Sequence, residues 1–173
     1  MKFPETIQTE RLILRPWRES DAAALYRCAK DPQVGLPCGW MPHTSEDYSR
    51  EVIRTILSAD GTYAVTLPET DLAIGSVSLQ PTTNPECIGH LMLGYWLGAD
   101  WWGNEYMPEA AGALLRCGFE DLGLTEIWCS HFEENHNSHR VIKKLGFEYR
   151  FQCRELAPFL GQMKNVWYYV KTP

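Results

Sequence analysis

The sequence lacks three features that would each point to a particular class of protein. It has no basic excess, because 16 Lys and Arg residues against 22 Asp and Glu residues give a net charge of -6. A polybasic surface for nucleic acid or for an anionic membrane is therefore not expected, and the acidic balance mildly favours amine substrates. No apolar run is long enough to cross a bilayer, and no repeat or low-complexity tract divides the chain. We expect one domain over residues 1–173, with no nucleic-acid or membrane partner.

The six cysteines form no C-x-x-C pair, the spacing that is typical of redox and zinc motifs. No apolar targeting run follows Met1, so we expect reduced thiols and a cytoplasmic location. His131, His136 and His139 do not complete a zinc spacing with a cysteine or a carboxylate, and no metal is expected.

The order of apolar and polar residues predicts a mixed α+β fold rather than strict βαβ alternation. The segment 35–42 holds two prolines and two glycines and is expected to be a loop. The longest helix is expected to end at Gly123 and to carry the apolar face of Ala111, Leu114 and Leu115. The expected strands are 9–17, 63–67, 73–79, 88–97, 126–132, 149–156 and 166–170, and the other helices are 20–30, 45–58 and 138–145.

The stretch 95–110, YWLGADWWGNEYMPEA, is the most informative part of the chain. It reads as the end of a strand, a short aromatic loop with glycines, and a helix start with Pro108 in the first turn. Proline suits that place because its fixed φ is helical and its missing N–H has no helical partner there. The free N–H groups of a helix start can hold a phosphate, so a ligand with a pyrophosphate is expected.

Three segments in register resemble the GNAT acyl-CoA N-acyltransferase family, and in particular its branch with the Rim-type ribosomal-protein N-terminal acetyltransferases. They are TERLILRPWRESDAAALY, the stretch from Tyr95 to Leu124, and NHNSHRVIKKLGF. The resemblance covers most of the chain. It implies the GNAT fold: one mostly antiparallel, twisted sheet of about six to seven strands, flanked by about four helices. It also implies acetyl-CoA as the co-substrate.

The phosphate loop departs from the family pattern at two positions. Glu105 replaces an expected glycine, and Met107 replaces an expected glycine or alanine. If the carboxylate points to solvent, the backbone N–H groups still hold phosphate. If it points inward, like-charge repulsion weakens coenzyme binding. The resemblance places the loop's cofactor contacts at Trp102, Gly103, Asn104, Glu105, Tyr106 and Met107.

The resemblance also places the pantetheine arm along the strand that ends at Leu97, where a backbone N–H of Tyr95 or Leu97 polarises the acetyl carbonyl. Ser138 is the expected proton donor to the departing thiolate, since the family's frequent tyrosine is replaced by Ile142. The alternative is that Ser138 only caps a helix. Asn135 is expected to bind the pantetheine arm, or else to make a turn.

Two roles are open to the charged residues of the last helix. Arg140, which we include among the cofactor contacts, and Lys144 either approach the phosphates of the coenzyme or form a solvated helix face.

The base that accepts the amine proton stays open among Glu133, Glu134, His131 and His90, and we select Glu133. Trp40 is expected at the substrate mouth, or else it only closes the core.

The expected activity is transfer of an acetyl group from acetyl-CoA to a primary amine by direct attack. The acceptor is a protein N-terminus or a small-molecule amine. The alternatives are a coenzyme-binding module without catalysis, which the Glu105 exchange and the missing tyrosine favour, and a protein with the same fold and another ligand. A homodimer is possible, although no sequence signature supports it.

Overall fold

The computed structural model describes residues 2–173 and contains one sheet of eight strands in the order β1-β2-β3-β4-β5-β6-β8-β7. Every neighbouring pair is antiparallel except β5 and β6, which run parallel. The predicted α+β fold with a mostly antiparallel sheet is confirmed, with eight strands in place of six to seven. The strands are β1 (Ile7–Gln8), β2 (Ile13–Arg15), β3 (Thr62–Leu67), β4 (Leu72–Pro81), β5 (Leu91–Leu97), β6 (Ile127–Phe132), β7 (Glu148–Ala157) and β8 (Gln162–Lys171).

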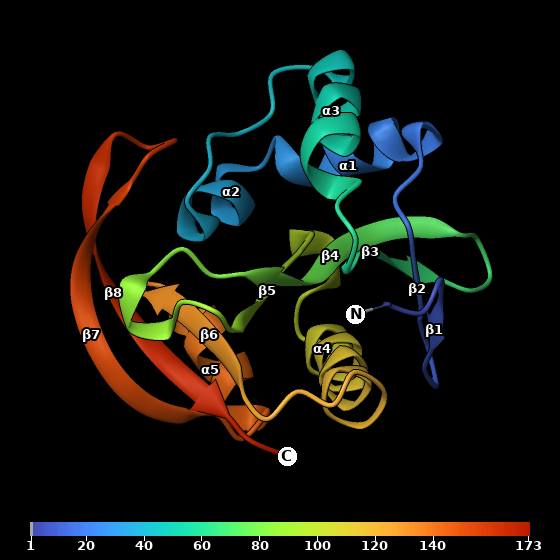
Figure 1. Cartoon of the computed structure of the whole chain (residues 1–173). Coiled ribbons are helices and arrows are strands. Elements are labelled where there is room, and N and C mark those ends of the chain that lie inside the picture. The colour runs from blue at the N-terminus through green and yellow to red at the C-terminus, as the bar shows by residue number, and fades with distance from the viewer. Residues whose placement is uncertain (1) are drawn as a thin grey trace.

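Helices cover both faces of the sheet, with α1, α2 and α3 on one side and α4 and α5 on the other (Figure 1). The long β7–β8 hairpin curves away at the edge of the sheet (Figure 1). The helices are α1 (Ala22–Ala29), α2 (Pro32–Cys38), α3 (Glu46–Val52), α4 (Tyr106–Arg116) and α5 (His136–Lys144). Within residues 2–173 none of them combines the length and the apolar character that crossing a membrane requires.

Helix α2 corrects the prediction of a loop over residues 35–42. With it the described residues form five α-helices, where about four were expected. The Asp31 side chain accepts a hydrogen bond from the N–H of Gln33 at 2.9 Å, and Pro32 occupies the first helical position. Gly39 ends the helix in the left-handed conformation, with φ 90. The Asp-Pro pair that was expected only to end α1 therefore also starts the next helix.

The strand predicted over residues 9–17 is also corrected. The N–H of Thr9 donates to the carbonyl of Leu12 at 2.9 Å, and this turn separates β1 from β2. Helix α5, expected from about Ser138, begins two residues earlier at His136.

Two layers of apolar side chains flank the sheet. Leu114 of α4 and Ile142 of α5 are fully buried against one face. Trp17 and Leu25 pack with the α1–α3 side on the other face. The predicted helical spacing of Leu114 and its neighbours is confirmed, because α4 turns this stripe into the core.

Candidate active site

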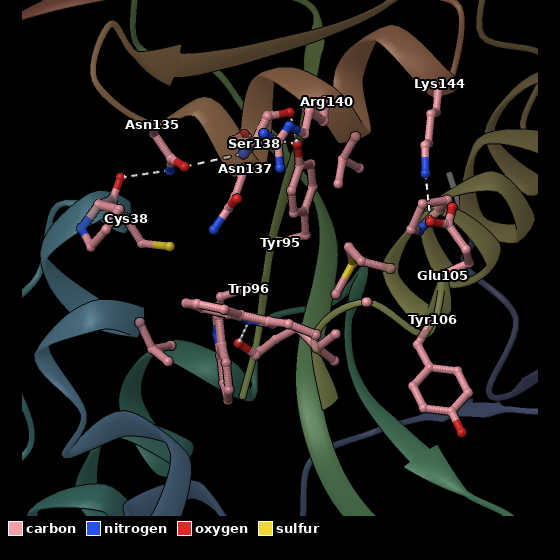
Figure 2. Close-up of a pocket in the computed structure, with 18 of the residues that line it drawn as sticks. Cys38, Tyr95, Trp96, Glu105, Tyr106, Asn135, Asn137, Ser138, Arg140 and Lys144 are labelled. Atoms are coloured by element: carbon pink, nitrogen blue, oxygen red, sulfur yellow. Dashed lines mark hydrogen bonds and ion pairs between the residues drawn. The ribbon is translucent and has the colours of Figure 1, made fainter. Parts of the chain in front are cut away.

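Strands β5 and β6 pair at one end and then diverge. The pairing joins Leu91–Leu93 to Ile127–Cys129, and past it the strands separate (Figure 1). A cavity of about 420 Å³ lies beside the diverging half of β5, with walls from α2, β5, the start of α4, and α5 (Figure 2). That volume is in the range of small-molecule sites.

The backbone of β5 presents hydrogen-bonding groups to this opening. The N–H of Gly98 donates to the carbonyl of Ile74 on β4 at 2.8 Å. Because alternate residues of a strand direct their N–H groups to the same neighbour, those of Tyr95 and Leu97 point the other way, into the opening. The Leu97 carbonyl fits this direction, since it accepts from Trp102 Nε1 at 2.8 Å. An extended ligand can pair with such an edge as an added strand.

Helix α4 begins at the mouth of the cavity with its first backbone N–H groups uncapped. Among residues 2–173, no side chain makes a capping hydrogen bond there. Glu105 precedes the helix with φ 62 and ψ 15, the left-handed conformation that glycine adopts most readily. Pro108 lies in the first turn, as predicted. The turn therefore has the geometry expected of a phosphate cradle in spite of the exchanged residue.

The Glu105 side chain takes neither of the two directions considered from the sequence. Its Oε1 lies 2.5 Å from Lys144 Nζ on α5, and both side chains are about half exposed (Figure 2). The carboxylate is thus neutralised by a cation at the rim of the cavity. Lys144, for which a phosphate contact and a solvated helix face were both considered, lies at this rim.

Ten of the eleven predicted cofactor contacts line this cavity. The exception is Asn104, whose side-chain amide donates to the carbonyls of Trp101 and Trp102 at 3.1 and 3.2 Å and so fixes the turn. Met107 belongs to the buried core and also lines the cavity. The ten are Tyr95, Leu97, Trp102, Gly103, Glu105, Tyr106, Met107, Asn135, Ser138 and Arg140.

Two hydroxyl groups meet at the inner wall of the cavity. Tyr95 Oη lies 2.8 Å from Ser138 Oγ and donates to the Ser138 carbonyl at 3.1 Å (Figure 2). Burial raises the pKa of Tyr95 well above its ordinary value of 10.0, so its hydroxyl stays protonated. Because Tyr95 has a single O–H proton and donates it to the carbonyl, the Ser138 hydroxyl donates to Tyr95 Oη, and rotation about its Cβ–Oγ bond would turn that proton to another acceptor. The sequence pointed to the backbone of Tyr95 but not to its hydroxyl.

Asn135, rather than Ser138, caps helix α5. Its Oδ1 accepts from the Ser138 N–H at 3.1 Å, and its Nδ2 donates to the Pro37 carbonyl on α2 at 3.0 Å. This amide ties two walls of the cavity together and leaves the Ser138 hydroxyl free of a capping role. The α2 wall, with Pro37 and Cys38, was missed because α2 was read as a loop; the Asp31-Pro32 pair was the available signal.

The structure does not bring the selected base to this cavity. Glu133 accepts from Asn165 Nδ2 at 2.8 Å and lines a separate polar cleft with Glu134, which is paired with Lys164. These side chains follow the end of β6, where the chain turns away from the opening. His90 Nε2 instead lies 3.1 Å from Glu126.

His131 is the base candidate that reaches the site. It lines a second cavity, of about 300 Å³, together with Tyr95 and Ser138. Its Nδ1–H donates to the Phe132 carbonyl at 2.7 Å, so the lone pair is on Nε2, where it accepts from the Tyr169 hydroxyl at 3.1 Å. Burial lowers the pKa of His131 below 6.5, so the ring is neutral at pH 7.

Trp40 lies in the wall of a third cavity, of about 370 Å³, which Tyr95 and Trp96 also line. Its ring meets that of Trp96 edge to face, with centroids 6.1 Å apart. The structure therefore brings Trp40 close to the predicted site while leaving it half-buried.

Comparison with known proteins gives a consistent result. Residues 11–148 match the family described as "Acetyltransferase (GNAT) domain". The chain is 30% identical over 168 residues to the uncharacterized N-acetyltransferase p20 of Bacillus licheniformis, covering 94% of this chain and 93% of that protein. It is 25% identical to YoaA, an uncharacterized N-acetyltransferase of Bacillus subtilis, over 84% of each chain.

Solved structures share the fold. A GNAT-family acetyltransferase from Bacillus anthracis superposes with a TM-score of 0.83 at 22% identity, covering 96% of this chain and 98% of that one. A putative ribosomal-protein-serine acetyltransferase from Vibrio cholerae superposes with a TM-score of 0.82 at 22% identity over the full length of both. At these identities the likeness concerns the fold alone.

Proposed function

The chain belongs to the GNAT acetyltransferase family, and on that premise we propose that it binds acetyl-CoA at the β5–β6 opening and transfers the acetyl group directly to a primary amine. One observation carries the proposal: a single cavity joins the free edge of β5, the uncapped start of α4 and the Tyr95–Ser138 hydroxyl pair.

The residues present fit this co-substrate. Tyr95 and Leu97 offer backbone groups to an amide-bearing arm, and the start of α4 offers N–H groups to a pyrophosphate. Arg140 and Lys144 add positive charge at the same rim. When bound, acetyl-CoA supplies the activated acetyl thioester.

The chain's own groups have distinct tasks in this scheme. The amine nitrogen forms a C–N bond to the acetyl carbon while the C–S bond breaks and its electron pair leaves with sulfur. The Tyr95 N–H is placed to hydrogen-bond the oxygen on which negative charge develops. Ser138 Oγ, which is hydrogen-bonded to the Tyr95 hydroxyl, donates its proton to the departing sulfur and regains a proton from water afterwards. His131 takes up the amine proton, directly or through a water.

Two classes of acceptor are compatible with this scheme. The resemblance of the sequence to the Rim-type branch supports a protein N-terminal amine. A small-molecule amine is the other acceptor. The six free cysteines support a reducing compartment such as the cytoplasm.

Thiol release from acetyl-CoA in the presence of peptides and small amines tests the proposal. We expect amine-dependent release, and we expect Ser138→Ala to lower the rate while calorimetry shows unchanged acetyl-CoA binding. Absence of binding in calorimetry would overturn the co-substrate assignment. Binding without release for any amine would leave only a coenzyme-binding module.

A further inference from the structure

Two more cavities continue from the Tyr95–Ser138 pair, away from the proposed cofactor site. The second cavity shares Cys38, Tyr95 and Ser138 with the first. The third shares Ser78, Gly94 and Tyr95 with the second. If the proposed function is correct, this joined space is where the acceptor amine approaches the acetyl group.

The joined space carries no formal charge near neutral pH. Among residues 2–173, no Asp, Glu, Lys or Arg lines either cavity, although these types make up 22% of the sequence. The titratable groups in the walls are Cys38, Tyr95 and His131. Burial keeps Tyr95 protonated and His131 neutral, and a thiol is mostly protonated at pH 7.

The walls are aromatic and aliphatic at the far end and hydroxyl-bearing nearer to Tyr95. Trp40, Trp96, Ile56 and Leu57 form the apolar part of the third cavity. Ser78 stands between the second and third cavities, where Gly94 leaves room: a Cβ added at Gly94 would lie 3.1 Å from Ser78 Oγ. A side chain at position 94 would therefore narrow the space.

We infer that the acceptor is a primary amine that carries no charge except its own ammonium group and that bears an apolar or aromatic substituent. A polyamine would bring further ammonium groups into walls that offer no carboxylate. A free amino acid would bring a carboxylate to walls that offer no guanidinium or ammonium group. Either charge would lose part of its hydration and gain no charged partner in the walls, which is costly. An amidated amino acid or the first residue of a peptide avoids both costs.

A matched panel of acceptors tests this inference, which rests on the proposed function. Phenylalanine amide, phenylalanine, glycine amide and spermidine are compared by kcat/KM at saturating acetyl-CoA. We expect phenylalanine amide to exceed phenylalanine and spermidine by about tenfold or more, because these two bring an uncompensated charge into the cleft. Glycine amide, which lacks the apolar group, should have the higher KM of the two amides.

The variant Ser78→Asp adds a carboxylate where the second and third cavities meet. We expect it to raise the ratio of spermidine to phenylalanine amide turnover several-fold, whereas Thr172→Asp, at an exposed position near the C-terminus, should leave the ratio unchanged. Thermal unfolding of both variants shows whether they are folded. Gly94→Ala is a second test of the same space. Because a side chain at position 94 narrows it, this variant should raise the KM for phenylalanine amide more than the KM for glycine amide.

The outcomes separate this inference from the proposed function. A wild-type preference for spermidine or for phenylalanine overturns the inference and leaves the acetyltransferase proposal standing. If acetyl-CoA binds but none of these amines nor any peptide is acetylated, the proposed function falls, and the inference falls with it.

Discussion

The Glu105 carboxylate and the Lys144 ammonium group lie 2.5 Å apart and bridge the start of α4 to α5 at the rim of the cofactor cavity. A pyrophosphate held at the start of α4 would compete with Glu105 for Lys144. Half-exposed ion pairs contribute about 0–1 kcal/mol, so a phosphate can displace this one at little cost.

Removal of the Glu105 charge should therefore strengthen coenzyme binding. We expect Glu105→Gln to lower the Kd for acetyl-CoA about two- to fivefold at low salt, and the gain should shrink at high salt as the charges are screened. Calorimetry at two ionic strengths measures both effects. Glu69→Gln, an exposed residue in the β3–β4 turn, is the control for net charge. An unchanged or weaker affinity of Glu105→Gln at low salt would contradict competition at this rim.

The Tyr95–Ser138 pair predicts non-additive kinetics. Ser138→Ala should lower kcat about tenfold or more if its hydroxyl protonates the sulfur, since general acids contribute about 10²–10⁴-fold. Tyr95→Phe should lower kcat less, because it removes only the group that orients Ser138. In the double variant the loss should match that of Ser138→Ala alone. Losses that multiply would show that the two hydroxyls act independently.

The sequence was most informative where local pattern decides structure. Helix α4 follows from the spacing of Leu114 and Leu115, and the phosphate turn follows from Pro108 and its neighbours. Helix α2 was missed because Gly35 and Pro37 suggested a loop. In the structure, the Asp31 cap and Pro32 outweigh them.

The relationships that the sequence did not reveal join residues far apart in the chain. Tyr95 and Ser138 are 43 positions apart, and Glu105 and Lys144 are 39 apart. Their contacts depend on how β5 and α5 pack, which local periodicity does not report. Glu133 was expected at the cofactor cavity, but the turn that follows β6 places it in another cleft.

A buried ion-pair network supports the α1 side of the sheet. Arg15 is 3% exposed and forms two hydrogen bonds to the Asp21 carboxylate, at 2.8 and 2.9 Å, and one to the Asp71 carboxylate at 2.7 Å. Arg15→Met leaves the Asp21 carboxylate buried without its partner, and we expect a loss of about 3–5 kcal/mol in the free energy of unfolding.

The exposed pair of Arg54 and Glu19, at 2.7 Å, supplies the matched control for this network. Arg54→Met should lower the free energy of unfolding far less than Arg15→Met, because water screens an exposed ion pair. Urea denaturation of both variants measures the difference. If both variants lost similar amounts of the free energy of unfolding, burial would not explain the contribution of the Arg15 network to stability.

The buried His131 predicts a loss of stability between neutral and mildly acidic pH. Its pKa is lowered in the folded chain, so at pH 7.5 the ring is neutral in both the folded and the unfolded states. As the pH falls through 6.5, the unfolded chain takes up the proton first, and the free energy of unfolding falls by up to about 1.4 kcal/mol per pH unit until the lowered pKa is reached.

Urea denaturation at pH 7.5, 6.5 and 5.5 should therefore show a smaller pH dependence in His131→Gln than in the wild type. In His131→Gln the free energy of unfolding should still depend on pH, although less steeply than in the wild type, because burial also lowers the pKa of His43. His43→Gln should reduce this pH dependence as well. Identical slopes for His131→Gln and wild type would contradict a buried neutral His131.

The same histidine predicts the acid side of the rate profile. If His131 takes up the amine proton, kcat/KM should fall with decreasing pH around a pKa below 6.5, because the protonated ring cannot accept a proton. The Nε2 lone pair also lies 3.1 Å from Tyr169 Oη and 3.3 Å from His139 Nδ1, so uptake of the amine proton at Nε2 would displace these contacts. His131→Gln should lower kcat/KM about 10²-fold and remove this acid limb, whereas Glu133→Gln should leave the profile unchanged. A wild-type acid limb that persists in His131→Gln would assign the base elsewhere, and its loss in Glu133→Gln would return that role to the carboxylate.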